Sequence, residues 1–309
     1  MRPFRFAVQL EKASGLAAWR ETARRVEDLG YSTLYMPDHL DDQYGPLVAL
    51  TVAAEATTRL KVGSLVFDND YRHPVLLAKE CATLDLASEG RLEVGLGAGW
   101  MKSDYDESGI AYDRPAVRVA RLEEAVSVMR ALWSEERVSF EGEHYRLADA
   151  HGLPRPHRPG GPPLVIGGGS RRVLELAARS ADVVGINPSL RSGNVGPETI
   201  ATTTAAHYAE RVGWVRQAAG ERLDSIELQS LVFLAEVGRP QKVVAEEVSA
   251  VVGYPPEEIA ASPIGLFGTE DEIVETLLSR REESGFSYWV LHEAEIEPFA
   301  PVVARLAGS

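Results

Sequence analysis

Eight short apolar segments alternate with helical patterns along the 309-residue chain, and this alternation is the feature that most constrains its fold. Strands that are separated by helices run parallel, because each helix carries the chain back to the starting edge of the sheet. Eight such units without an intervening linker predict one domain, residues 1–309, with the α/β (β/α)8 TIM-barrel fold and insertions. An open, doubly wound sheet is the alternative. The expected strands cover residues 5–10, 33–36, 60–67, 92–96, 164–166, 182–186, 226–237 and 288–291.

The segments between these strands carry helix signals, including apolar residues at spacings of three and four. Residues 138–147 instead predict a hairpin that turns at Glu141 and Gly142, and residues 100–113 read as polar and irregular. Residues 187–197 form a loop rich in Gly, Ser and Pro. The expected helices cover residues 16–29, 47–57, 74–86, 116–133, 171–180, 199–219, 241–251, 270–284 and 296–306.

The stretch L-V-I-G-G-G-S-R-R, residues 164–172, joins an apolar strand to a helix through three glycines. Ser170 suits the N-cap of that helix. Free backbone N–H groups and the positive end of the helix favour an anion at this place, and glycines let a ligand approach the backbone. We therefore expect a phosphate site formed by Gly167, Gly168, Gly169, Ser170 and Arg171. A tight loop without a ligand is the alternative.

Polar and glycine residues follow three other strands, and in a barrel all strand ends open on one mouth. Asp38 and His39 follow the second strand. A carboxylate beside an imidazole can serve as a proton relay, with Asp38 positioning His39; a loop pair that caps a turn is the alternative. Gly63 and Ser64 predict a bulge within the third strand.

The fourth strand ends in G-L-G-A-G-W, residues 95–100. A dinucleotide fingerprint would need a helix that begins directly at the glycines, so we reject that interpretation. We expect the glycines to keep the mouth open for a flat ring; a kinked strand end is the alternative.

Composition excludes several classes of function. The net charge is −14, with most of the acidic excess in residues 221–309, so nucleic-acid binding is not expected. No apolar run is long enough to span a membrane, and the chain begins directly in a strand without room for a signal peptide. The single cysteine, Cys81, excludes an internal disulfide. Asp68 and Asp70 alone do not make a metal site. These features favour the cytoplasm and predict no metal.

Five blocks in order resemble the bacterial luciferase-like flavin and deazaflavin oxidoreductases. The blocks are D-L-G-Y-S-T-L-Y-M-P-D-H, R-L-E-V-G-L-G-A-G-W-M-K-S-D-Y, S-G-I-A-Y-D-R-P-A-V-R-V-A-R-L-E-E-A-V, F-E-G-E-H-Y-R-L and P-P-L-V-I-G-G-G-S. Residues 4–190 carry the resemblance well, and it is strongest to the actinobacterial branch that uses coenzyme F420. It implies a TIM barrel, a homodimer and a tricyclic ring in the mouth.

The resemblance also implies roles for single residues. Asp38 and His39 match the pair beside the reactive face of the ring. Ser64 and Leu65 match a strand-three bulge where the family often has a non-prolyl cis peptide behind the ring. Gly97, Ala98 and Gly99 match ring contacts, and residues 168–171 match the phosphate site. Trp100 is a departure, because the family's sugar-phosphate dehydrogenases have glutamate there; an aromatic or apolar substrate wall is expected instead.

Three functional hypotheses follow from these residues and this resemblance. The first is a cytoplasmic oxidoreductase that moves a hydride between coenzyme F420 and an organic small molecule, with His39 exchanging a proton. The second is an FMN-dependent monooxygenase that uses oxygen; both cofactors carry a tricyclic ring and a phosphate. The third is a barrel that binds a flavin without catalysis.

Overall fold

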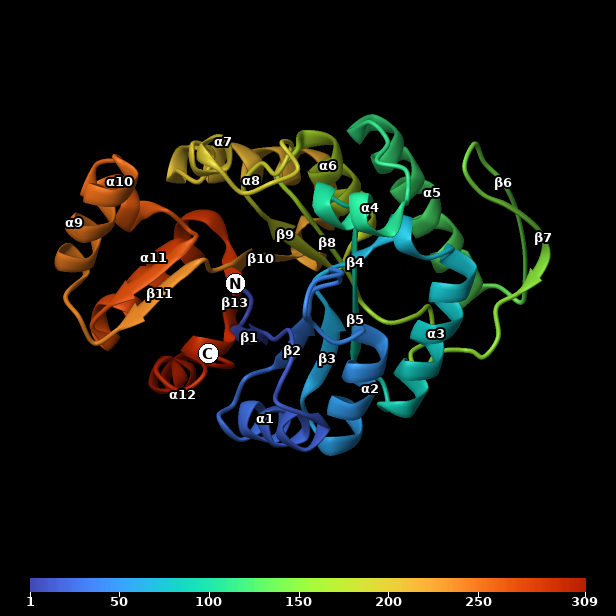
Figure 1. The fold of residues 1–309 in the computed structure, drawn as a ribbon, viewed down its shortest axis with the longest axis horizontal. Coiled ribbons are helices and arrows are strands. Elements are labelled where there is room, and N and C mark those ends of the chain that lie inside the picture. Colours follow the sequence, from blue (N-terminus) through green and yellow to red (C-terminus); the bar gives the residue numbers. More distant parts are fainter.

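The computed structural model describes all residues from 1 to 309, and its centre is a closed barrel of eight parallel strands. β1 pairs with β2 on one side and with β13 on the other, and a pairing between β3 and β5 completes the ring. The predicted (β/α)8 barrel is therefore confirmed (Figure 1). Its strands are β1 Arg5–Gln9, β2 Thr33–Met36, β3 Lys61–Ser64, β5 Leu92–Gly97, β8 Leu164–Gly168, β9 Val183–Ile186, β10 Glu227–Leu231 and β13 Phe286–His292.

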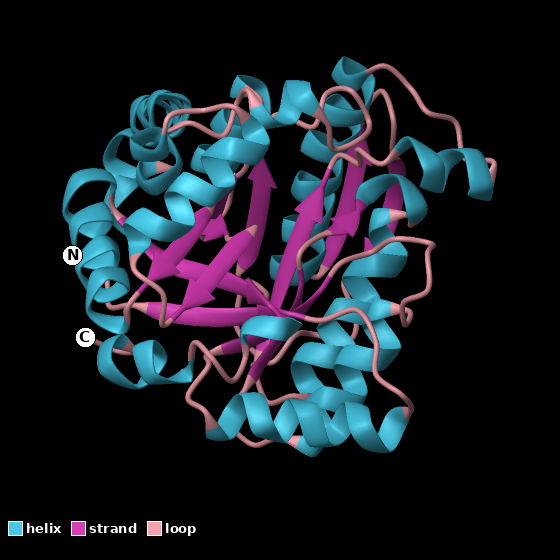
Figure 2. Cartoon of the chain, turned by 60° about the vertical axis from the view of Figure 1, so that its left-hand side comes forward, coloured by secondary structure: helices cyan, strands magenta, loops and turns pink.

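Helices form a layer outside the barrel (Figure 2). The longer helices turn apolar residues inward; the first of them buries Trp19, Ala23 and Val26. None combines the length and the apolar character that crossing a bilayer requires. The principal helices are α1 Leu16–Asp28, α2 Pro46–Ala56, α3 Pro74–Ala87, α5 Pro115–Ser134, α6 Arg171–Ser180, α8 Ala205–Ala219, α11 Glu270–Ser284 and α12 Ala300–Leu306.

Two predicted strands are each divided in the structure. Residues 60–67 form β3 and a separate β4, Phe67–Asp68, with a cis peptide bond between Leu65 and Val66. The cis bond thus lies one residue beyond the expected Ser64–Leu65 bulge. Residues 226–237 leave the barrel after β10, and β11, Leu234–Val237, pairs with β12, Gly265–Gly268, in a small sheet outside it.

Two further segments also differ from expectation. Residues 100–113 contain a short helix, α4 Lys102–Ser108, and residues 199–219 divide into α7, Pro197–Ile200, and α8. The predicted hairpin is present as β6, Arg137–Glu141, and β7, Arg146–His151. Helices α9, Gln241–Val252, and α10, Pro256–Ala261, lie with β11 on the side of the barrel opposite this hairpin (Figure 1).

A buried network of charges crosses the barrel near the N-terminal ends of the strands. Glu93 is 1% exposed and accepts hydrogen bonds from Arg5 at 2.5 Å and from Lys61 at 3.0 Å. The hydroxyls of Tyr35 and Tyr288 also donate to Glu93, at 2.5 and 3.1 Å. The barrel interior at this end is therefore filled by a polar layer.

Candidate functional site

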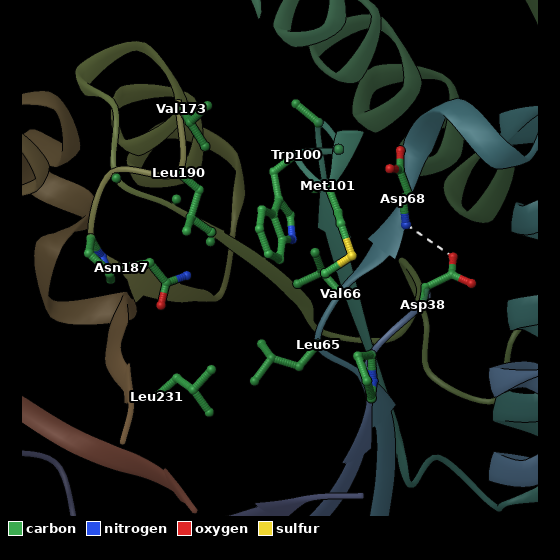
Figure 3. A pocket seen from close by; sticks show the side chains of 18 of the residues that line it. Asp38, Leu65, Val66, Asp68, Trp100, Met101, Val173, Asn187, Leu190 and Leu231 are labelled. Atoms are coloured by element: carbon green, nitrogen blue, oxygen red, sulfur yellow. Dashed lines mark hydrogen bonds between the residues drawn. The ribbon is translucent and has the colours of Figure 1, made fainter. Parts of the chain in front are cut away.

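The principal cavity lies at the C-terminal ends of the strands, as expected for this fold, and has a volume of about 950 Å³. This volume is at the upper end of small-molecule sites, so the cavity has room for a cofactor and a second molecule. Figure 3 shows side chains that line it. The structure brings ten of the predicted site residues to its wall: Asp38, His39, Leu65, Gly97, Ala98, Gly99, Gly167, Gly168, Gly169 and Ser170.

Two predicted site residues do not line the cavity. The buried hydroxyl of Ser64 donates to the carbonyl of Gly95 at 2.8 Å, so this side chain ties β3 to β5. Arg171 extends along its own helix and pairs with Glu175 at 2.8 Å. Neither side chain is placed to contact a ligand, because each is directed to a partner within the protein.

His39 has a carboxylate partner, but the partner is not Asp38. Its Nδ1 donates to Oδ2 of Asp104 at 2.7 Å, and the hydroxyl of Tyr71 donates to the same oxygen at 3.0 Å. Asp104 comes from α4 and is buried. A carboxylate only accepts hydrogen bonds, so this contact holds the proton on Nδ1 and leaves Nε2 as the acceptor. Nε2 makes no hydrogen bond within the protein.

Asp38 instead anchors the loop after β4. Its carboxylate forms a two-pronged ion pair with Arg72, and Oδ2 accepts from the backbone N–H of Asp68 at 3.1 Å (Figure 3). The predicted role of Asp38 in positioning His39 is therefore wrong. Adjacency in the chain suggested that role, but successive residues at a strand end point in different directions.

Asp68 is a buried carboxyl group on the same wall, and burial raises its pKa to about 7. The nearby charges of Asp70 and Asp38 act in the same direction, while hydrogen bonds from the N–H of Asp70 and from Tyr105 oppose the shift. This carboxyl group therefore changes its protonation near neutral pH, unlike an ordinary aspartate.

Replacement of Asp68 by asparagine should remove a pH dependence of stability. The pKa of Asp68 in the folded state lies above the ordinary 3.8, so the folded protein binds this proton more tightly than the unfolded chain does. Protonated Asp68 therefore stabilises the fold at low pH, and this stabilisation is lost as pH rises through about 7. Urea unfolding at several pH values between about 5 and 8 measures the effect. As pH rises across this range, we expect the free energy of unfolding of the variant to increase by a few kcal/mol relative to that of wild type. A constant difference between the two proteins would contradict the assignment.

Two glycines at the site are required by the protein's own packing. A Cβ at Gly99, whose φ is +73°, would lie 1.8 Å from the hydroxyl of Tyr105. A Cβ at Gly169 would lie 2.3 Å from the carbonyl oxygen of Pro188. These positions need glycine even without a ligand, so the glycines alone do not demonstrate a phosphate site.

The N-terminus of α6 nevertheless fits an anionic group. Ser170 is the N-cap residue, as predicted, but its side chain makes no capping hydrogen bond. The first turn of α6 contains no acidic residue, and both Ser170 and Val173 line the cavity. The first N–H groups of a helix lack intrahelical acceptors, so a phosphate oxygen can accept from them here.

A loop from residue 187 to 196 forms the roof of the cavity, and sequence patterns could not assign its residues. The carbonyl of Gly193 accepts from the backbone N–H of Lys102 at 3.2 Å, which joins the loop to the start of α4. Leu190 and Val195 line the cavity from this loop, together with Asn187 at its start. Leu231 and Phe233 contribute from the end of β10, where no motif marked them.

The barrel, its mouth and the glycine turn match one family of proteins. Residues 1–288 match the model of the luciferase-like monooxygenase family. The chain belongs to this family. Within it, an uncharacterised protein of Mycobacterium tuberculosis is 32% identical over 183 residues, which cover 52% of this chain and 64% of that protein. The matched segment thus spans less than two-thirds of that relative.

A longer match and a solved structure extend the comparison. The F420-dependent glucose-6-phosphate dehydrogenase of Nakamurella multipartita is 29% identical over 295 residues, which cover 90% of this chain and 82% of that protein. The coenzyme F420-dependent tetrahydromethanopterin reductase from Methanopyrus kandleri has a TM-score of 0.78 at 17% identity, with 98% of this chain and 99% of that chain covered. The second likeness concerns the fold alone.

Proposed function

We propose that the protein is an oxidoreductase that transfers a hydride between coenzyme F420 and an organic small molecule. The observation that carries the proposal is the arrangement of His39, whose Nδ1 is held by Asp104 while Nε2 is free at the cavity wall. Relatives named F420-dependent glucose-6-phosphate dehydrogenase support the choice of cofactor. When bound, the cofactor supplies the group that accepts or donates the hydride.

The protein's own residues would bind the cofactor and move a proton. Gly97, Ala98 and Leu65 would form walls for a flat ring, and the N-terminus of α6 would hold the phosphate. His39 accepts a proton at Nε2 when an alcohol is oxidised, or returns it when a carbonyl is reduced. Asp104 keeps the imidazole in the tautomer that this requires and stabilises the imidazolium.

Replacement of Ser170 by aspartate tests the phosphate site. An aspartate at the N-cap accepts hydrogen bonds from the free N–H groups of α6 and adds a negative charge where the phosphate would lie. We therefore expect an unchanged or higher Tm together with a Kd for F420 that rises by about tenfold or more, which corresponds to 1.4 kcal/mol. Ser170→Gly, which adds no charge, is the control. A Kd for Ser170→Asp equal to that of Ser170→Gly would place the phosphate elsewhere.

The alternative is an FMN-dependent monooxygenase, which the description of the family favours. The two hypotheses differ in whether the reaction consumes oxygen. An F420 enzyme changes the absorbance of its cofactor in a sealed anaerobic cuvette with a suitable substrate, whereas a monooxygenase consumes dissolved oxygen in proportion to product. Oxygen consumption with FMN, and no anaerobic reaction with F420, would reverse our choice. A barrel that binds a cofactor without catalysis would show neither.

We also propose that the protein is a homodimer in which α2 and α3 face the partner. Each helix exposes a large apolar side chain, with Val48 of α2 71% exposed and Leu76 of α3 61% exposed. A hollow of about 340 Å³ adjoins α3 and is lined in part by Leu76 and Leu153. Light scattering should give twice the 33.7 kDa chain mass, and Leu76→Glu should lower it. A wild-type mass of one chain would contradict the proposal.

A cytoplasmic location is proposed as well. The single cysteine, Cys81, is buried and unpaired, which is ordinary where thiols stay reduced. Cell fractionation with an antibody against the protein tests this, and recovery outside the cytoplasmic fraction would contradict it.

A further inference from the structure

Four large apolar side chains line the outer part of the cavity, and we name them the outer cage: Trp100, Leu190, Val195 and Phe233. Leu231 lies deeper, where it packs with Leu65 against the barrel interior. The outer cage comes from three separate segments, namely the loop after β5, the roof loop and the residues that follow β10. Figure 3 shows Trp100 and Leu190 on the cavity wall. Val195 and Phe233 are 62% and 47% exposed. Large apolar side chains gathered at a cavity mouth are typical of a surface that binds apolar molecules.

The charged residues of the cavity do not compete for this space. Asp38 and Asp104 are buried and bound, to Arg72 and to His39. Arg118 is also buried; it donates to the carbonyl of Gly99 at 2.5 Å and lies over the ring of Tyr112, while its Nε has no partner. Asp68 is bound by the hydroxyl of Tyr105. The remaining charged residues on the wall are exposed at the rim: Glu11, Asp41, Arg114 and Arg191. The outer cage itself carries no charge.

Trp100 connects the outer cage to the reactive side of the cavity. Its ring meets the imidazole of His39 edge-on, with centroids 5.6 Å apart. Its carbonyl accepts from the hydroxyl of Tyr112 at 3.0 Å, which fixes the backbone at this point. A molecule held against Trp100 therefore has one end beside Nε2 of His39 and the rest among apolar side chains.

We propose that the outer cage binds the apolar body of the substrate, and that the substrate is an uncharged molecule whose one polar group, a hydroxyl or carbonyl, lies at His39. The inference rests on the proposed function for the role of that polar group. Burying each methylene in the cage contributes about 0.8 kcal/mol, which is about a fourfold change in Kd. A sugar phosphate gains no comparable binding energy there, because the side chains of the outer cage carry no cation and their only hydrogen-bond donor is the indole N–H of Trp100.

Calorimetric titration of the F420-saturated protein with 2-hexanone, 2-heptanone, 2-octanone and 2-nonanone tests the proposal. Kd should fall by up to about fourfold per methylene, and glucose 6-phosphate should bind more weakly than the longest ketone. A Kd that does not change with chain length, no measurable ketone binding, or tighter binding of glucose 6-phosphate would each overturn it. Ketone binding that F420 abolishes would show that the cage holds the cofactor ring, which also overturns it.

Variants locate the binding, and the wild-type series stands even if a variant fails to fold. Trp100→Ala should weaken 2-nonanone binding by tenfold or more, from the loss of roughly 1.5–3 kcal/mol of apolar burial, whereas Trp100→Phe should retain most of it. Trp214→Phe, on α8 away from the cavity, is the matched control. Equal affinities in Trp100→Ala and Trp214→Phe would overturn the assignment. If F420 does not bind, the proposed function fails. The ketone series on the free protein then still tests whether the outer cage binds apolar molecules.

Discussion

Replacement of His39 by alanine is expected to lower kcat by about 10²–10⁴-fold, the range that a positioned acid or base contributes. The physical reason is the free Nε2, which Asp104 keeps ready to accept a proton at the cavity wall. The Kd for F420 should stay near the wild-type value, because the ring and phosphate contacts come from other residues. Steady-state kinetics and fluorescence titration on the same preparation measure both quantities.

Asp104→Asn and Asp38→Asn form a matched pair for this prediction. An amide at position 104 can donate to Nδ1 and so favour the opposite tautomer, which removes the acceptor at Nε2. We expect Asp104→Asn to lower kcat with little change in KM or in the Kd for F420. Asp38→Asn should act mainly on stability, since Asp38 binds Arg72. If Asp38→Asn lowers kcat more than Asp104→Asn at equal Tm, the geometry has been assigned wrongly.

Replacement of Glu93 by glutamine is expected to lower the free energy of unfolding by about 1–3 kcal/mol, because Lys61 loses its carboxylate partner and Arg5 keeps only Glu227. Glu93 is 1% exposed between Arg5 and Lys61. Burial raises the pKa of its carboxyl group, but the charges of Arg5 and Lys61 outweigh burial and lower the pKa to about 2. The stabilisation is therefore present above the ordinary pKa of 4.5 and is lost as pH falls toward 2.

Urea unfolding at neutral pH measures this change, and Glu297→Gln is its control. Glu297 also pairs with an arginine, Arg25, through two contacts of 2.6 Å, but both side chains are exposed to solvent. Exposed pairs contribute little, since water and salt screen them. A Glu93→Gln variant as stable as Glu297→Gln would show that the polar layer inside the barrel does not depend on this charge.

The eight barrel strands could be predicted because each is a local pattern, an apolar run bounded by turn residues. Strand ends converge in any parallel barrel, so Asp38, His39 and the two glycine turns could also be assigned to one mouth before any geometry was known. The alternation of strands and helices indicates the fold class, and the fold class places residues that follow a strand at the mouth of the barrel.

Side-chain partners could not be predicted, because they depend on contacts between distant segments. Asp104 lies 65 positions from His39, on a helix whose short polar sequence resembled a loop. Arg171 looked like a phosphate ligand, but its partner Glu175 stands one helical turn away and competes for it. The spacing of four residues between Arg171 and Glu175 could have predicted this ion pair from the sequence. No sequence pattern predicts Asp104 as the partner of His39.

A parallel titration of the protein with F420 and with FMN, followed by cofactor fluorescence, tests the central claim most directly. Both cofactors carry a phosphate that the N-terminus of α6 could hold, so that site alone does not distinguish them. We predict micromolar binding of F420 and no saturable binding of FMN over the same range. Micromolar binding of FMN without binding of F420 would contradict the account.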